Sequence, residues 1–228
     1  MGGLTALATW QVHRRAWKLD LIARVEARVH ADPVPAPVPE RWAALTAAGD
    51  EYRRVTVTGA WTADRPTLVQ AATELGGGYW VMQPFARDDG TTVLVNRGFV
   101  PAGRREAASS ALNSGRVTVT GLLRMSEPGG GFLRLNDPAA DRWYSRDVAA
   151  IAASLGLRGA APYFIDAQAG PGGALPVGGL TVISFPNNHL IYAFTWGALA
   201  LMTAAGAIFV NLDVLRSRAD WRASRSAE

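Results

Sequence analysis

An uncharged segment near the C-terminal end most constrains how this chain can fold. Residues 167–212 contain no Asp, Glu, Lys or Arg, and their second half, Leu190–Leu212, is an almost continuous apolar run. A helix of that length rises about 1.5 Å per residue and reaches about 34 Å, which matches a hydrocarbon core of about 30 Å. A buried core helix is the alternative, but such helices are usually about 10–14 residues long. The run therefore predicts a transmembrane helix over residues 189–212.

The distribution of basic residues orients this helix. Residues 169–188 contain no Lys or Arg, whereas four arginines follow the helix: Arg216, Arg218, Arg222 and Arg225. The positive-inside rule makes residues 213–228 a cytoplasmic basic tail and places the upstream domain outside the cytoplasm. A tail-anchored protein with a cytoplasmic domain, the alternative, would put the four arginines on the wrong side.

The N-terminal residues 1–9 resemble the end of an apolar helix and do not have the pattern of a signal peptide. We therefore expect them to be the remnant of a first transmembrane helix that is mostly missing from this sequence. The full-length protein would then be multi-pass, with its main domain between two membrane helices. Residues 10–31 have helical periodicity and predict an amphipathic helix that continues outward.

The segment 32–188 has the pattern of a β-rich domain. A proline-rich strap over 32–39 and a short helix over 40–48 come first. Alternation of apolar and polar residues then predicts strands, and a further helix is expected over 147–155. The expected strands cover 53–61, 79–85, 92–99, 116–124, 162–167 and 180–185. The sequence predicts a membrane-anchored α+β protein with a small antiparallel sheet or partial barrel and peripheral helices.

Composition excludes several classes of function. The chain has 228 residues, a net charge of +4 and no cysteine, so it has no disulfide framework and no cysteine-ligated metal. Its arginines form no basic run, and we expect no nucleic-acid partner. Hydrolase elbows, zinc-protease helices and phosphate loops are all missing, so we do not expect an enzyme.

One histidine stands out from this background. His189 is the only ionisable side chain of the apolar stretch apart from tyrosine, and it lies at the mouth of the predicted membrane helix. Tyr192 and Trp196 follow at helical spacing and share its face. An imidazole in this position is a candidate axial ligand for a haem at the bilayer surface. The alternative is an interfacial histidine that caps the helix or hydrogen-bonds to lipid headgroups.

Four motifs, in this order and spacing, resemble the Surfeit locus protein 1 family, the assembly factors of cytochrome c oxidase. They run over nearly the whole chain, from about Thr9 to Leu215, and the fourth is the most specific. The motifs are Trp10-Gln11 with Arg14 and Trp17-Lys18; Leu94-Val95-Asn96-Arg97-Gly98-Phe99-Val100-Pro101; Gly131-Phe132 with Asn136-Asp137-Pro138, Trp143-Tyr144 and Asp147; and Asn187-Asn188-His189-Leu190 with Tyr192-Ala193 and Thr195-Trp196.

The resemblance implies a function as well as a fold. It implies a hairpin in the bacterial inner (cell) membrane that binds haem a and aids its insertion into oxidase subunit I. The histidine of the fourth motif is implicated in haem binding in bacterial relatives, and this carries over to His189 as the haem-iron ligand. Haem contacts of Tyr192 and Trp196 are inferred from helical spacing alone. The partners implied are subunit I and membrane lipid, with haem a synthase as a further candidate.

A different class of function is also open. The chain could be a haem-independent membrane scaffold that stabilises an assembly intermediate of subunit I. Arg97, in the second motif, and the loop 129–137 would then form the interaction surface. The alternative for Arg97 is a residue that fixes a turn at the end of a strand. The two functions differ in one respect that can be tested, since only haem binding requires His189.

Overall fold

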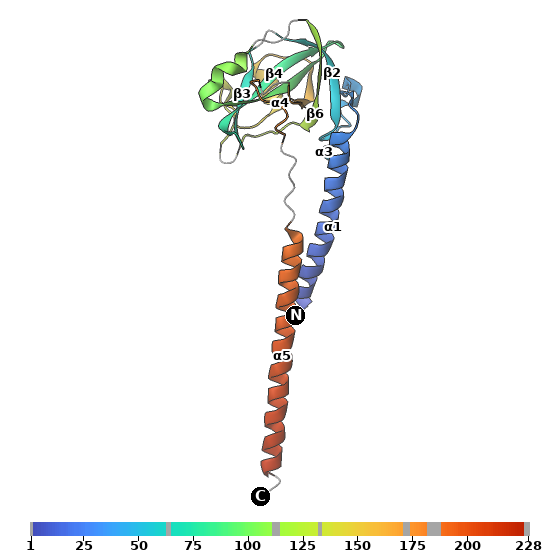
Figure 1. Cartoon of the computed structure of the whole chain (residues 1–228), viewed down its shortest axis with the longest axis vertical. Coiled ribbons are helices and arrows are strands. Elements are labelled where there is room, and N and C mark those ends of the chain that lie inside the picture. Colours follow the sequence, from blue (N-terminus) through green and yellow to red (C-terminus); the bar gives the residue numbers. More distant parts are fainter. Residues whose placement is uncertain are drawn as a thin grey trace. The chain divides into compact units, whose positions relative to one another are not determined.

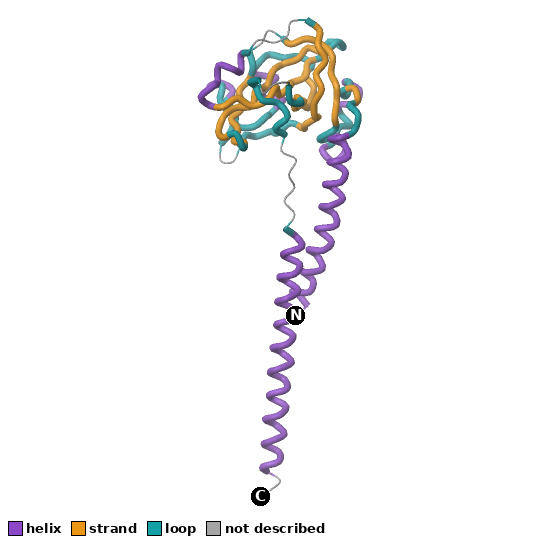
Figure 2. Tube along the Cα trace, viewed as in Figure 1, coloured by secondary structure: helices purple, strands orange, loops and turns teal. Residues whose placement is uncertain are grey.

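The computed structural model describes residues 2–62, 65–110, 115–131, 134–170, 174–181 and 188–225. The chain divides into two compact units. Residues 1–24 and 184–228 form a helical unit, and residues 25–183 form a β domain, which contains all the described strands (Figures 1 and 2).

The helical unit is built on two long helices, α1 (Gly2–His30) and α5 (His189–Arg225). The segment His189–Val214 of α5 has a mean hydropathy of 1.8 and no buried residues. Among the described residues it is the one helical segment long and apolar enough to cross a membrane. It contains the span predicted over 189–212, and the helix then continues into the basic tail.

The β domain is organised around a ring of five hydrogen-bonded strands. In ring order these are β2 (Arg54–Trp61), β6 (Arg116–Met125), β7 (Ala160–Ala167), β5 (Thr92–Pro101) and β4 (Gly76–Arg87). The ring closes because the last three residues of β2 leave β6 and pair with β4. Two strands extend the sheet outside the ring: β3 (Thr67–Thr73) lies on β4, and β1 (Val34–Pro35) lies on β2. The sheet is therefore a closed barrel rather than the partial one expected.

The prediction of an antiparallel sheet is wrong in two places. β5 pairs with β7 in parallel, and β1 pairs with β2 in parallel. The long stretch of chain between β5 and β7 supplies the crossover that a parallel pair needs. A period of two identifies a strand but carries no information about the direction of its neighbour, so the sequence pattern could not reveal this.

The twice-occurring sequence Val-Thr-Val-Thr-Gly forms the β2–β6 ladder. Residues 55–59 run antiparallel to residues 117–121, so each copy is the other's neighbour. Both glycines lie where another strand passes closely. A Cβ on Gly59 would lie 2.0 Å from the Ala86 carbonyl oxygen, and one on Gly121 would lie 2.2 Å from that of Asp166. The two similar segments are thus paired strands with glycine at the crowded points, and not a tandem repeat.

The central strands are buried on both faces. In β5, Val93 and Val95 pack in one apolar cluster, whereas Leu94 packs in another. The second cluster contains Trp143 and the inner face of helix α4 (Val148–Ser154). This double burial explains why β5 carries apolar residues at successive positions, as in Val93-Leu94-Val95.

The short helices agree only partly with the sequence pattern. α4 confirms the helix predicted over 147–155, with Asp147 as its N-cap. The single helix predicted over 40–48 is wrong, because the chain forms two separate turns, α2 (Pro39–Trp42) and α3 (Ala47–Asp50). Thr46 adopts an extended backbone and caps α3 by accepting the Gly49 N–H, which interrupts the helix. Two 3-10 helices, η1 (Ala102–Ser109) and η2 (Pro138–Ala140), complete the elements.

The connecting segments also bear on two predictions. The proline-rich strap is extended as expected, and its residues 34 and 35 form β1. Of the strand predicted over 180–185, residues 180 and 181 are not in a strand, and the remaining four lie outside the described residues. β3 was not predicted, because its sequence TLVQAAT alternates only weakly.

Candidate functional site

The first turn of α5 presents the histidine that the sequence singled out. α5 begins at His189, directly after Asn188, whose carbonyl accepts the Tyr192 N–H at 3.3 Å. Asn188 therefore stands at the helix start that the sequence predicted. His189 is half-buried, and it begins the apolar segment that could cross a membrane.

A glutamine of α1 holds one ring nitrogen of this histidine. Nδ1 of His189 lies 2.7 Å from Oε1 of Gln11, a buried side chain. An amide oxygen only accepts, so a hydrogen bond through Oε1 has the Nδ1–H as its donor, and a neutral ring that makes this bond has its lone pair on Nε2. A lone pair on Nε2, with the other nitrogen hydrogen-bonded, is the arrangement of a metal-ligating histidine.

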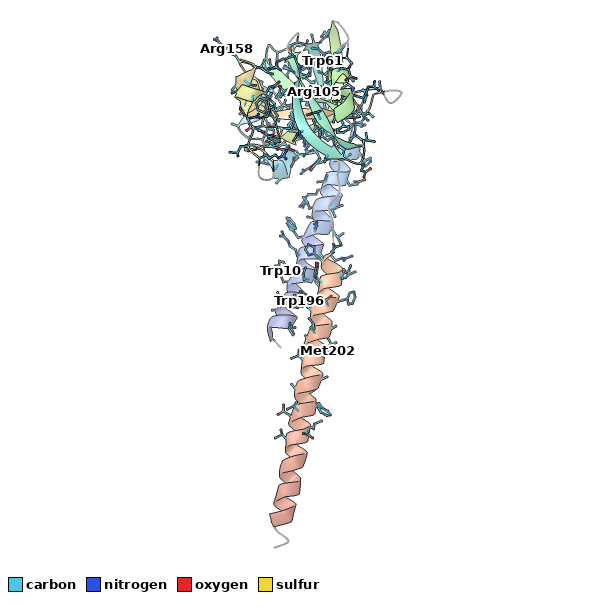
Figure 3. All side chains as sticks on the ribbon, turned by 90° about the vertical axis from the view of Figure 1, so that its left-hand side faces the viewer. Trp10, Trp61, Arg105, Arg158, Trp196 and Met202 are labelled. Carbon is cyan, nitrogen blue, oxygen red and sulfur yellow. The ribbon has the colours of Figure 1, made fainter. Side chains whose placement is uncertain are left out.

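The two helices lie side by side along this part of the helical unit, and Trp10 of α1 and Trp196 of α5 lie at a similar level (Figure 3). The less exposed residues recur every three or four positions on each helix. On α1 these residues are Leu4, Ala8, Gln11, Arg15 and Lys18, and on α5 they are His189, Ala193, Trp196, Gly197 and Ala200. This spacing is that of two helices packed along a seam.

The other residues predicted around His189 differ in their exposure. Trp196 is half-buried on the same face as His189, whereas Tyr192 is 53% exposed. Ala193 and Gly197 follow His189 along the same face, about one and two turns further on. A Cβ on Gly197 would meet no atom within 4 Å. The face beside the imidazole therefore carries small residues and open space next to an aromatic ring.

Arg97 lies in the β domain and bonds to its own domain. Its guanidinium donates to the Ala108 carbonyl at 3.1 Å and to Ser110 Oγ at 3.0 Å. Burial lowers the pKa of Arg97. These contacts hold the end of η1 against β5, so Arg97 has a structural role from within the strand rather than at a turn that ends it. Whether Arg97 also contacts a partner stays a prediction.

The residues beside Arg97 explain the rest of the second motif. Asn96 accepts the Gly98 N–H through Oδ1 and donates to Asp166 through Nδ2, at 3.1 Å and 2.7 Å. Gly98 has φ of +129°, and a Cβ there would lie 2.3 Å from the Val177 carbonyl oxygen. The motif thus fixes a close approach between the backbone of β5 and the segment at Val177.

Sequence reasoning missed a cluster of charged side chains around Asp166, the residue that Asn96 contacts. Asp166 is 4% exposed and receives Arg124 at 3.1 Å and Arg146 at 3.2 Å. Glu51 and Glu127 pair with the outer sides of these arginines. Burial disfavours the charged form of Arg124, but the nearby carboxylates, Asp166 first, outweigh it and raise the pKa of Arg124. A single carboxylate at the end of the apolar strand PYFIDA was the available signal.

The third motif is also structural among the described residues. The Asn136 side chain accepts the Tyr144 N–H at 2.8 Å and donates to Ser145 Oγ at 3.0 Å. Asp137 caps η2, and Asp147 caps α4. Phe132 and Asn187, from the third and fourth motifs, lie outside the described residues. No group of three or more His, Cys, Asp or Glu in the described parts of the chain could hold a bare metal ion.

Comparison with known proteins adds the family. The SURF1 family model matches residues 1–201. Surfeit locus protein 1 of Homo sapiens is 38% identical over 220 residues, which cover 87% of this chain and 70% of that protein. The protein of the same name from Xenopus tropicalis is 37% identical, covering 87% and 69%. A SURF1-like protein of Monosiga brevicollis is 36% identical over 221 residues, covering 90% and 82%.

Proposed function

The chain belongs to the SURF1 family of cytochrome c oxidase assembly factors, and we propose that it binds haem a through His189 and aids haem insertion into subunit I. The observation that carries the proposal is the 2.7 Å contact from Gln11 to Nδ1 of His189, which leaves Nε2 as a lone-pair donor. Haem a is the cargo in this proposal, and the protein catalyses no reaction on it.

The surroundings of His189 suit a flat apolar cargo. Haem supplies four nitrogen ligands of its own, so one imidazole is enough to attach its iron. Gly197 leaves room on the helix face, since a Cβ there would meet no atom within 4 Å, and Trp196 offers an aromatic surface on the same side. We assign Tyr192 to the rim of the site, since its ring is exposed.

The number of ligands fits a carrier better than a permanent holder. A cargo protein must hold an apolar cofactor tightly enough to keep it out of water and loosely enough to release it. One histidine at the surface of a helix gives a weaker attachment than an enclosed pocket with two ligands. Subunit I would receive the haem, and haem a synthase would supply it.

We also propose where the site operates. α5 would cross the bacterial cell membrane, with its arginine-rich end in the cytoplasm and the β domain outside. His189, as the first residue of the apolar segment, would then lie at the outer bilayer surface in contact with lipid. Haem a, which is strongly apolar, would be handed over within the membrane surface rather than through water.

An optical spectrum tests the haem proposal. The full chain is expressed in cells that make haem a, purified in mild detergent and compared with His189→Ala and with His13→Ala, a histidine exposed on α1. We expect a haem Soret band and a reduced α-band in the wild type and in His13→Ala, and their loss in His189→Ala. A haem-free wild type that still purifies with subunit I would refute haem binding and leave the scaffold function.

A second set of variants tests the role of Gln11. Gln11→Leu removes the acceptor for Nδ1, and we expect it to weaken haem retention by about 10–100-fold. Gln11→Glu keeps an acceptor and should retain haem. Equal haem content in both variants would show that Gln11 does not position the imidazole.

A further inference from the structure

A cleft lies along the outer edge of β3 in the β domain. Its main hollow has a volume of about 430 Å³ and a floor of small residues from two paired strands. There Ala71 and Ala72 of β3 lie opposite Gly78 and Gly77 of β4. A second hollow of about 240 Å³ shares three of its lining residues. We call the two together the β3 cleft, and the shared residues are Gln70, Tyr79 and Tyr144.

Two arginines lie over the tyrosines of the β3 cleft. The Arg105 guanidinium carbon is 5.1 Å from the ring centre of Tyr79, and that of Arg134 is 5.4 Å from the ring centre of Tyr144. Arg134 also donates to Oε1 of Gln70 at 3.3 Å. A cation–π contact holds each guanidinium over its ring and leaves most of its N–H donors available. Arg105 is exposed, and Figure 3 labels it on the β domain.

The charges of the β3 cleft do not balance. Its lining carboxylate, Asp141, pairs with Arg65 at 2.6 Å, and a third lining arginine, Arg142, pairs with Asp137 at 2.5 Å. Within the described ranges, no carboxylate lies in ion-pair contact with Arg105 or Arg134. The cleft therefore carries two positive charges that its own residues leave uncompensated.

The strand geometry sets the spacing of the two segments that carry the tyrosines. Tyr79 is the cross-strand partner of Gln70, and the Gln70 N–H donates to the Trp143 carbonyl at 2.8 Å. The segments that carry Tyr79 and Tyr144 therefore lie on either side of β3. Their backbones are two strand spacings apart, which corresponds to about 10 Å. An arginine fork matches a carboxylate with two parallel hydrogen bonds. The cleft consequently offers two carboxylate positions over a floor of small side chains.

We propose that the β3 cleft binds an extended acidic segment of a partner protein. Because backbone groups of a strand point alternately to either side, those of Ala72 face the same outer edge as those of Gln70. An extended polypeptide can use such an edge as well as the two arginines, whereas a lipid headgroup or free phosphate uses only the charge. The site is independent of haem, since it shares no residue with the surroundings of His189.

Peptide binding tests this proposal on the full chain in neutral detergent micelles. The probe is a fluorescent ten-residue peptide of alternating Glu and Val, followed by anisotropy at low salt, with a Gln–Val peptide as the uncharged control. Arg105→Gln/Arg134→Gln is compared with Arg104→Gln/Arg158→Gln, which removes the same charge from exposed arginines outside the cleft. We expect the first pair to weaken binding at least tenfold and the second pair to change it less than twofold.

Three results would overturn the proposal. These are no binding of the acidic peptide, equal binding of the Gln–Val peptide, and equal loss in both double variants. Displacement of the peptide when phosphatidylglycerol is added to the micelles would identify a lipid headgroup as the occupant instead. The haem spectrum of Arg105→Gln/Arg134→Gln should equal that of the wild type, so failure here is distinguishable from failure of the haem proposal.

Discussion

Replacing Asp166 by Asn should destabilise the β domain strongly. Asp166 is 4% exposed, and Asn96, Arg124, Arg146 and Thr181 all donate to its two oxygens. Asn removes the negative charge and turns one oxygen, a hydrogen-bond acceptor, into an N–H donor. The new NH2 group takes the place of Oδ1 or Oδ2, and at either position it faces arginine N–H groups, which only donate. The substitution therefore leaves two arginines, each 12% exposed, without their shared buried carboxylate.

The size of the effect follows from the remaining partners. Removing one partner of a buried ion pair typically costs about 3–5 kcal/mol. Arg124 and Arg146 retain Glu51 and Glu127, at 3.2 Å and 2.6 Å, so we place the loss near the lower end, at about 3 kcal/mol. For a domain of this size, each kcal/mol lowers the midpoint of thermal unfolding by about 2–4 °C. The expected decrease is about 6–12 °C.

The assay is thermal unfolding of the full chain in mild detergent, followed by tryptophan fluorescence. Trp143, buried in the β domain, reports on its packing. Asp88→Asn is the matched control, because Asp88 also pairs with an arginine, Arg116, but both side chains are exposed to solvent. We expect little change in the control. If Asp166→Asn lowered the midpoint no more than Asp88→Asn, the buried cluster would not hold the barrel together.

Two further predictions concern the barrel. Gly98→Ala should lower the unfolding midpoint markedly, because alanine is strained at φ of +129° and its Cβ would lie 2.3 Å from a carbonyl oxygen. Gly103→Ala, where a Cβ meets no atom within 4 Å, should leave the midpoint unchanged. Equal midpoints of the two variants would refute this. Burial raises the pKa of Tyr163 to about 12, so its neutral form stabilises the folded state below pH 10 and this contribution is lost as the pH rises towards 12. Stability measured from pH 9 to 12 should therefore fall more steeply in the wild type than in Tyr163→Phe, and parallel curves would contradict the shift.

Local patterns predicted the elements of this fold better than their assembly. The alternation in residues 53–61 and 116–124 predicted β2 and β6, and Asp147 marked the start of α4, because these signals act within a few residues. Which strands become neighbours depends on contacts between distant segments, such as Gly121 against Asp166. The parallel β5–β7 pair and the closure of the barrel were therefore beyond reach of the sequence pattern.

The same limit applies to the candidate site. The position of His189 in an uncharged stretch made it a candidate from sequence alone. Gln11, at the other end of the chain, stands in the first motif, but the motif gave it no role, and only the structure brings it to Nδ1 of His189. Arg105 and Arg134 resemble any exposed arginines until β3 and the segment at Trp143 place them at one cleft.

The two proposed sites use different physical chemistry, and this has a consequence for how the protein would work. Attachment of haem to His189, as proposed, would depend on a metal–nitrogen bond and apolar contact, which salt hardly weakens. Binding at the β3 cleft depends on exposed charges, which salt screens within about 8–10 Å at physiological ionic strength. A partner held by the cleft can therefore bind and leave rapidly while the cargo stays attached.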